Sequence, residues 1–268
     1  MKRYIYVLFM FITLNLWACS DSEPSTDGGG EEVVDKTTDC QSANEKGAYT
    51  TWYKPANGWV GDPIPYYDNG KFYIFYLQDW RSGYPFLHPW HMVYSTDLSS
   101  FTFGGETIPC GKEDEQDVAL GTGGVIKDRT TGEYCAFYTG HQWKWQEMGV
   151  PTQAILLTTS KDMKTWKRYS GNPVFAHEAD GTITGDAHIQ KMGDVYVMFY
   201  FSAFEPSRKY KAFNTFAASY DLVNWTDWKG ADLIIPSKNY DELFAHKSYV
   251  VKHDGVVYHF YCAVNNAE

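Results

Sequence analysis

The sequence is short of positive charge and of the cysteine patterns that bind metals. Lysine and arginine number 23 against 33 acidic residues, which gives a net charge of −10. No basic stripe of the kind that neutralises phosphates is present. No CxxC pair and no Cys/His metal spacing occurs. We therefore expect no nucleic acid partner and no metal site on cysteine.

Helical periodicity is also scarce, whereas aromatic residues are abundant. The chain has 21 Tyr, 16 Phe and 10 Trp, which together make 18% of its residues. Flat apolar rings with polar edges suit the faces of sugars, although packing between aromatic-rich strands explains the same excess. At 268 residues the chain is long enough for one large all-β domain or two small ones.

The first 19 residues have the pattern of an export signal. Lys2 and Arg3 precede a mostly apolar run that ends near Leu16 and is too short for a lasting transmembrane helix. A small residue directly before Cys19 resembles the lipobox of bacterial lipoproteins, in which this cysteine carries the lipid. We therefore expect an exported protein anchored to the membrane through Cys19, on the periplasmic or cell-surface side of the outer membrane.

The next segment has little to bury. Residues 20–45 form a polar stretch that we expect to be a flexible linker, and residues 46–268 form the folded domain. Four further cysteines are present, and an oxidising compartment permits disulfides between them. Cys135 and Cys262 fall inside aromatic strands and are interpreted as buried thiols. The other two are Cys40 and Cys110.

One hairpin pattern recurs four times and predicts the fold. A buried strand, a tight turn and an aromatic strand start at Gly61, Gly121, Gly185 and Ala245. The first three units end in a common Ser-x-Asp-(Leu or Met)-x-x-aromatic pattern, which predicts a strand followed by an Asp-led turn. We assign Asp97, Asp162 and Asp221 of these turns no chemistry.

Two hairpins per unit predict four antiparallel strands every sixty residues or so, which is typical of a β-propeller. A β-sandwich would show irregular strand spacing and no recurring turn. We expect an all-β, five-bladed propeller. Because the fourth unit reaches only its second strand by Glu268, the sequence suggests a fragment that lacks the rest of blade four and a fifth blade.

The first strands of propeller blades gather around a central axis, so the residues that open them should converge. These are Asp62, Asp186, His246 and Lys247, with Thr122 and Gly123 in the second unit. Asp62 lies eleven residues before Tyr73, Asp186 ten before Tyr196, and His246 twelve before Tyr258. We therefore expect Asp62, Asp186 and His246 to lie at one level.

The motifs resemble those of five-bladed propeller glycoside hydrolases, the group of families 32, 43, 62, 68 and 117. The strand WVGDPIP is similar to the one that bears their catalytic aspartate, and Gly185-Asp186-Ala187 resembles the Arg-Asp-Pro of family 32. The resemblance extends from Trp52 to Cys262 and includes three further motifs, namely Gly121-Thr122-Gly123-Gly124, Tyr138-Thr139-Gly140 and Asn172-Pro173-Val174.

The resemblance implies a glycosidase with Asp62 as nucleophile or base and Asp186 stabilising charge on the sugar ring. Families 32 and 43 have a glutamate in the third position, where this chain has His246. Family 117, which cleaves anhydrogalactose-containing algal oligosaccharides, uses a histidine as general acid, and an imidazole suits that role at neutral pH. His246 is the favoured acid, and Glu242 is the alternative. This acid/base chemistry requires no cofactor.

Several other side chains are candidate substrate contacts, each with simple packing as the alternative. His88, Trp90 and His91 belong to an aromatic loop, and His141 and Trp143 follow the second unit's aromatic strand. His188 lies two residues beyond Asp186, on the same face of a strand. Lys247 is a candidate for binding an anionic sugar group or for pairing with Asp62 or Asp186.

The candidate substrates are fructans, arabinose- or xylose-containing glycans and algal galactans. A non-catalytic glycan-binding lipoprotein is the alternative function, because the usual third carboxylate is missing. A propeller that serves as a protein interaction platform would have no affinity for sugars.

Overall fold

The computed structural model describes residues 53–56, 58–79, 88–176, 182–204 and 212–265. The predicted export signal, Cys19, the linker and Cys40 lie outside these ranges. The chain divides into two units, Met1–Asp35 and Lys36–Glu268, and every described residue belongs to the second unit.

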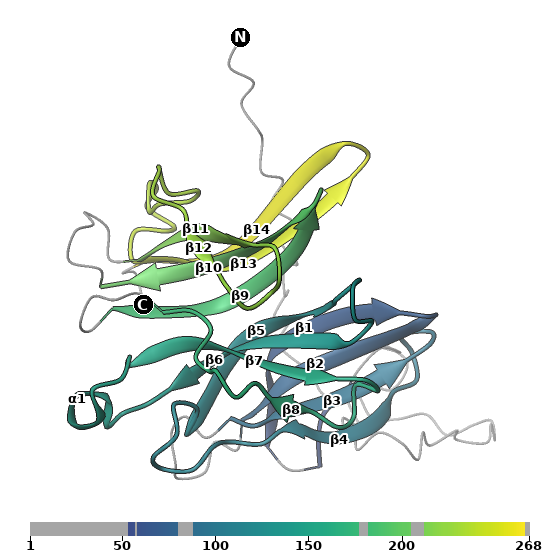
Figure 1. The fold of residues 1–268 in the computed structure, drawn as a ribbon. Helices are drawn as coiled ribbons and strands as arrows, with labels where there is room; N and C mark the ends of the chain where they lie inside the picture. Colours follow the sequence, from purple (N-terminus) through teal and green to yellow (C-terminus); the bar gives the residue numbers. More distant parts are fainter. Residues whose placement is uncertain (1–52, 57, 80–87, 177–181, 205–211, 266–268) are drawn as a thin grey trace, which may run out of the picture. The chain divides into compact units, whose positions relative to one another are not determined.

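The described chain is all-β and antiparallel, as predicted (Figure 1). Three sheets have four strands each, joined in chain order, and the last sheet is a hairpin. Sheet A comprises β1 (Trp59–Asp68), β2 (Lys71–Asp79), β3 (Trp90–Ser95) and β4 (Thr102–Ile108), and sheet B comprises β5 (Ala119–Lys127), β6 (Tyr134–His141), β7 (Gln153–Ser160) and β8 (Lys167–Arg168). Sheet C comprises β9 (Ile183–Met192), β10 (Val195–Ala203), β11 (Ala212–Ser219) and β12 (Thr226–Asp227), and hairpin D comprises β13 (Phe244–His253) and β14 (Val256–Val264).

Local turn chemistry explains the hairpins. Asn69 and Gly70 between β1 and β2 have positive φ angles of 50° and 78°, the backbone that joins two twisted strands tightly. Asp254 and Gly255 repeat this turn between β13 and β14, with φ angles of 48° and 76°.

The Asp-led turns are also confirmed and are nearly identical in three places. In the second one, Asp162 Oδ1 accepts hydrogen bonds from the backbone N–H groups of Lys164 and Thr165, both at 2.8 Å. Ser160 Oγ accepts from the N–H of Met163 at 2.8 Å, which holds Met163 at a φ angle of 60°. Asp97 and Asp221 make the corresponding bonds, so these aspartates organise turns, as predicted.

Strand β6 lies between two hydrophobic cores. Tyr134, Ala136 and Tyr138 pack into the core that contains sheet A residues such as Phe75. The intervening Cys135 and Phe137 pack into the core shared with sheet C. Because successive side chains point to opposite faces, a strand covered on both sides needs a nearly unbroken run of apolar residues, and YCAFY supplies it.

Tyrosines link consecutive sheets at the hairpin turns. Tyr134 Oη in β6 donates to Asp68 Oδ2 at the end of β1, at 2.6 Å, and Lys127 Nζ donates to the same oxygen at 3.1 Å. Tyr196 Oη in β10 donates to Asp128 Oδ1, just after β5, at 3.1 Å. We call these two contacts the Asp–Tyr links; each fixes the outer end of one first strand against the next sheet.

The described cysteines are free thiols. Cys135 is buried, as expected. Cys262 is exposed, so the expectation that it is buried is wrong, because its side chain lies on the open face of hairpin D. Among the described residues, the one helix, α1 (Trp145–Met148), is a single turn, and none of their helices is long and apolar enough to cross a membrane.

Replacing Tyr134 or Tyr196 by Phe should destabilise the domain without altering the fold. Each change removes a hydrogen bond to a carboxylate, and we expect a loss of about 1 kcal/mol of unfolding free energy for each. Urea denaturation followed by circular dichroism measures it. Tyr220→Phe is the control, because this side chain is 79% exposed. A loss in the control equal to that of Tyr134→Phe would contradict the role of the Asp–Tyr links.

Candidate active site

The first strand of every sheet has a β-bulge at the same level. The ladder register shifts between Gly61 and Ile64, between Leu120 and Gly123, between Gly185 and His188, and between His246 and Tyr249. Asp62, Asp186 and Lys247 in these bulges have positive φ angles of 43°, 55° and 55°. Left-handed backbone at residues other than glycine is costly and clusters at functional sites. Bulges also redirect side chains next to active sites.

The register corrects one step of the sequence argument. His246 pairs with Cys262 just as Gly61 pairs with Leu77, so Lys247, and not His246, occupies the position of Asp62 and Asp186. The prediction counted residues back from a tyrosine and was one position off. The corresponding residue of sheet B is Gly121, which has no side chain.

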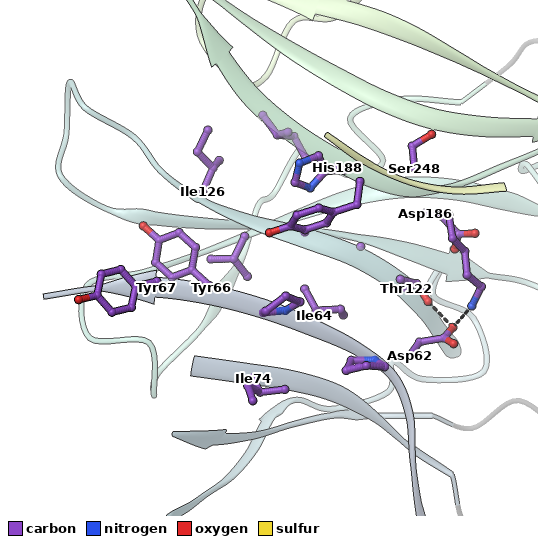
Figure 2. A pocket seen from close by; sticks show the side chains of 18 of the residues that line it. Asp62, Ile64, Tyr66, Tyr67, Ile74, Thr122, Ile126, Asp186, His188 and Ser248 are labelled. Atoms are coloured by element: carbon purple, nitrogen blue, oxygen red, sulfur yellow. Dashed lines mark hydrogen bonds and ion pairs between the residues drawn. The ribbon is translucent and has the colours of Figure 1, made fainter. Parts of the chain in front are cut away.

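The bulges lead into one cavity of about 670 Å³. Figure 2 shows its two different ends. Asp62, Thr122 and Asp186 lie together at one end, and Tyr66, Tyr67 and Ile126 line the other. Lys247 completes the charged end. Residues from all four sheets thus line one cavity, although Asp62 and Lys247 are 185 positions apart in the sequence.

Asp62 is held in its ionised form. Its Oδ2 atom accepts hydrogen bonds from Lys247 Nζ and from Thr122 Oγ1 (Figure 2). Burial by itself raises the pKa of Asp62, but the bonds from Lys247 and Thr122, together with the charge of Lys247, outweigh burial and hold the pKa below its usual range. The pairing expected for Lys247 is therefore made with Asp62.

Asp186 is positioned through its backbone by a buried threonine. Thr139 Oγ1 accepts a hydrogen bond from the Asp186 N–H at 2.9 Å and donates one to the Thr122 carbonyl oxygen at 2.8 Å. Gly185 leaves room for this hydroxyl, because a Cβ there would lie 2.8 Å from it. One hydroxyl thus joins the bulges of sheets B and C.

His246 contacts the same aspartate from beside the cavity wall. Its Nδ1 atom lies 3.7 Å from Asp186 Oδ2. Its ring packs edge-on against Phe201, with ring centres 5.8 Å apart, and also contacts Phe244. The convergence of Asp62, Asp186 and the His246–Lys247 segment agrees with the sequence argument. Glu242 is exposed, on the segment before β13.

His188 lines the cavity beyond the charged end. It is buried, and its Nε2 donates to the Val250 carbonyl oxygen at 3.2 Å. The Tyr249 ring lies against it, with centroids 4.2 Å apart. Burial lowers the pKa of His188 to about 4, so the ring is neutral near pH 7.

Two residues of the aromatic loop do not reach the cavity. Trp90 is fully buried and its indole N–H donates to the Gly121 carbonyl oxygen at 2.9 Å, so it supports the sheet B bulge and the expected sugar contact is wrong. The His91 ring lies stacked on those of Tyr76 and Phe103, at 5.8 and 6.0 Å, and is not part of the cavity wall. His88 is half-buried and lies near His141. Trp143 is 40% exposed on the segment after β6.

Two hydroxyl residues and one thiol of the site were missed from sequence. Thr122 and Thr139 belong to the motifs that carried the resemblance, but only the fold shows their bonds to Asp62 and Asp186. Cys262 lines the cavity, and burial and the two aspartates raise the pKa of its thiol, against the opposing charge of Lys247. Across the described ranges, no group of three or more His, Cys, Asp or Glu side chains is placed to hold a metal ion.

Comparisons with known proteins agree with this geometry. The family model described as "Glycosyl hydrolases family 32 N-terminal domain" matches residues 52–190, just over half of the chain. A solved structure named "Glycoside hydrolase" is 49% identical, with a TM-score of 0.67, over 81% of this chain and 70% of its own. Another, named as a complex of BT0996 and RGII, is 50% identical with the same TM-score and the same coverage.

A more distant relative is named for an activity. The "Levanbiose-producing levanase" of Bacillus subtilis (strain 168) is 31% identical over 151 residues, which is 54% of this chain. The match spans 28% of the levanase, so most of that protein has no counterpart in it.

Replacing Lys247 by Met should raise the pKa of Asp62. The change removes the ammonium group that outweighs burial, so the carboxylate will protonate at higher pH than in the wild type. A lowered pKa adds stability above the unfolded-state pKa, and this stability is lost as the pH falls through the folded-state value. The variant should therefore lose less stability on acidification.

Carbon-13 NMR titration of the Asp62 carboxyl group measures this change. Lys229→Met is the matched control, because Lys229 is exposed and pairs with Asp227. An unchanged Asp62 titration in Lys247→Met would show that the ion pair does not control this carboxylate.

Proposed function

The chain belongs to glycosyl hydrolase family 32, and on that premise we propose that it is a glycosidase that cleaves O-glycosidic bonds in an oligo- or polysaccharide outside the cytoplasm. One observation carries the proposal. Asp62, Asp186 and the His246–Lys247 segment, from three separate sheets, meet at one end of a cavity, and the Asp62 carboxylate is ionised. The location outside the cytoplasm is a prediction from residues 1–19.

The proposed reaction uses Asp62 as the attacking group or as the base that activates water. Either role needs an ionised carboxylate close to the sugar. The hydrogen bonds from Lys247 and Thr122 leave Asp62 ionised, and both fall on Oδ2. Oδ1 is then the oxygen we assign to the substrate or the attacking water.

Asp186 is the proposed stabiliser of the positive charge that develops on the sugar ring. Its backbone bond to Thr139 orients it before substrate binds, which reduces the reorganisation needed in the transition state. His246 is the proposed acid, supported by its Nδ1 atom 3.7 Å from Asp186. Glu242 is the alternative acid.

The proposed complete fold is a closed five-bladed propeller, of which sheets A to C and hairpin D are parts. One face of hairpin D supports this. Tyr249 pairs with Phe260 and Val251 pairs with Tyr258, and these four side chains are 38–51% exposed. An apolar sheet face of this kind needs a cover, and another blade would supply it.

The relatives suggest a substrate class. The levanase name indicates fructans, whereas the structure at 50% identity is named for RGII. The second match is closer in sequence and covers 81% of this chain against 54%. We therefore place RGII glycans before fructans.

The Lys247–Asp62 pair favours one other function, a glycan-binding protein without turnover. An ammonium group bonded to the carboxylate neutralises its charge and makes it a weaker nucleophile and base. In that case the cavity end would hold a sugar by hydrogen bonds alone.

Replacing Asp62 by Asn separates the two functions. In an enzyme, this change should reduce the release of reducing sugar at least about a hundredfold while glycan binding persists. The assay uses the full chain with levan oligosaccharides and RGII oligosaccharides. Asp97→Asn, in a turn without assigned chemistry, is the control. A wild-type protein that binds glycan but releases no sugar would identify the binding protein.

Replacing His246 by Asn tests the acid. The variant should lose most of its activity on natural glycans but little on a 2,4-dinitrophenyl glycoside, whose leaving group needs no protonation. Glu242→Gln should behave like the wild type on both substrates. The opposite pattern in the two variants would assign the acid to Glu242.

A further inference from the structure

We propose that His141 is the residue that sheet B supplies to the site, as a neutral imidazole that hydrogen-bonds a sugar hydroxyl in the place left open by Gly121. The inference rests on the proposed glycan site and deepens it. Sheets A, C and D present Asp62, Asp186 and Lys247 from the bulge of their first strand, whereas the bulge of sheet B has glycine at this position.

The His141 ring occupies the space that a side chain at Gly121 would fill. A Cβ built on Gly121 would lie 2.7 Å from His141 Nε2 and 3.0 Å from Thr139 Cβ. The first distance is shorter than real Cβ contacts, so a larger residue at 121 would displace the imidazole. The Gly121 backbone does not require glycine for its conformation, because its φ is not positive. The absence of a side chain is therefore explained by His141.

Strand β6 delivers two side chains to the same place. Thr139 and His141 are two residues apart and point to the same side of the strand. Thr139 binds the Asp186 backbone. His141 is the last residue of β6, and its backbone pairs with Ala119 and Gln153 on either side. The ring is thus mounted on a central strand of a four-stranded sheet, which gives it a fixed position.

The surroundings of His141 suit a neutral hydrogen-bonding group. Burial lowers its pKa to about 4, the neighbouring His88 acts in the same direction, and the charge of Asp186 opposes them. Near pH 7 the ring therefore has one N–H donor and one acceptor nitrogen. A sugar hydroxyl also donates and accepts, so the two match. A neutral ring with this pKa is a poor proton donor at pH 7, which distinguishes His141 from the acid.

Two variants of His141 test the inference directly. In the full chain, His141→Ala should weaken binding of RGII or levan oligosaccharide about five- to tenfold, as measured by isothermal titration calorimetry. His141→Gln retains a donor and an acceptor and should recover most of the affinity. His253→Ala, which removes an exposed histidine from the β13–β14 hairpin, should bind like the wild type. Thermal unfolding checks that each variant is folded.

Gly121→Ala tests the placement while leaving the imidazole in the protein. It should lower affinity as His141→Ala does, and the double variant should lose less than the sum of the two single losses. Gly61→Ala is the matched control, because a Cβ there makes only ordinary contacts of 3.4 and 3.5 Å with Leu77.

The outcomes separate this inference from the proposed function. Wild-type affinity in folded His141→Ala, or equal losses in His141→Gln and His141→Ala, would overturn the inference while leaving glycosidase activity intact. Binding without sugar release by the wild type would overturn the enzyme proposal, and the affinities would still test His141. A wild type that binds neither oligosaccharide would count against both.

Discussion

The bulge in each first strand is the constraint on which the site depends. An unbroken strand would alternate its side chains strictly between two faces, and the extra residue redirects one of them toward the cavity. Asp62, Asp186 and Lys247 accept an unfavourable left-handed backbone at this point. The surrounding ladders and the Thr139 hydroxyl hold that backbone in place, so the stability of the sheets maintains the geometry of the site.

The charged end of the cavity combines groups that need one another. Two buried carboxylates side by side would raise each other's pKa values, and one of them would be neutral. Lys247 and Thr122 both contact Asp62, whereas Asp186 faces His246. Each aspartate therefore has its own partners, which allows the two to differ in protonation and in chemical role. This division is what acid/base chemistry on a glycosidic bond requires.

Most of the fold was predictable, because its signals are local. Asn69-Gly70 and the Ser-x-Asp turns each specify a backbone conformation within a few residues, and the alternation in β6 specifies burial on both faces. Asp62 and Asp186 were found because both open a repeated strand. His246 was placed one position off, since a bulge adds a residue that no residue count reveals. Trp90 was misplaced because a tryptophan in an aromatic loop has the same sequence whether it faces solvent or the core. Thr139 acts on a residue 47 positions away, through a contact that exists only once two sheets are adjacent.

The Asp–Tyr links also bear on how the protein is made. Asp68 finds Tyr134 only after a further 66 residues have been synthesised, and Asp128 must wait 68 residues for Tyr196. During translation, each sheet therefore leaves the ribosome with its outer turn unsecured until the next sheet has emerged. Assembly should then proceed from the amino-terminal end by successive docking, and the most recently made sheet is always the one most exposed to misfolding.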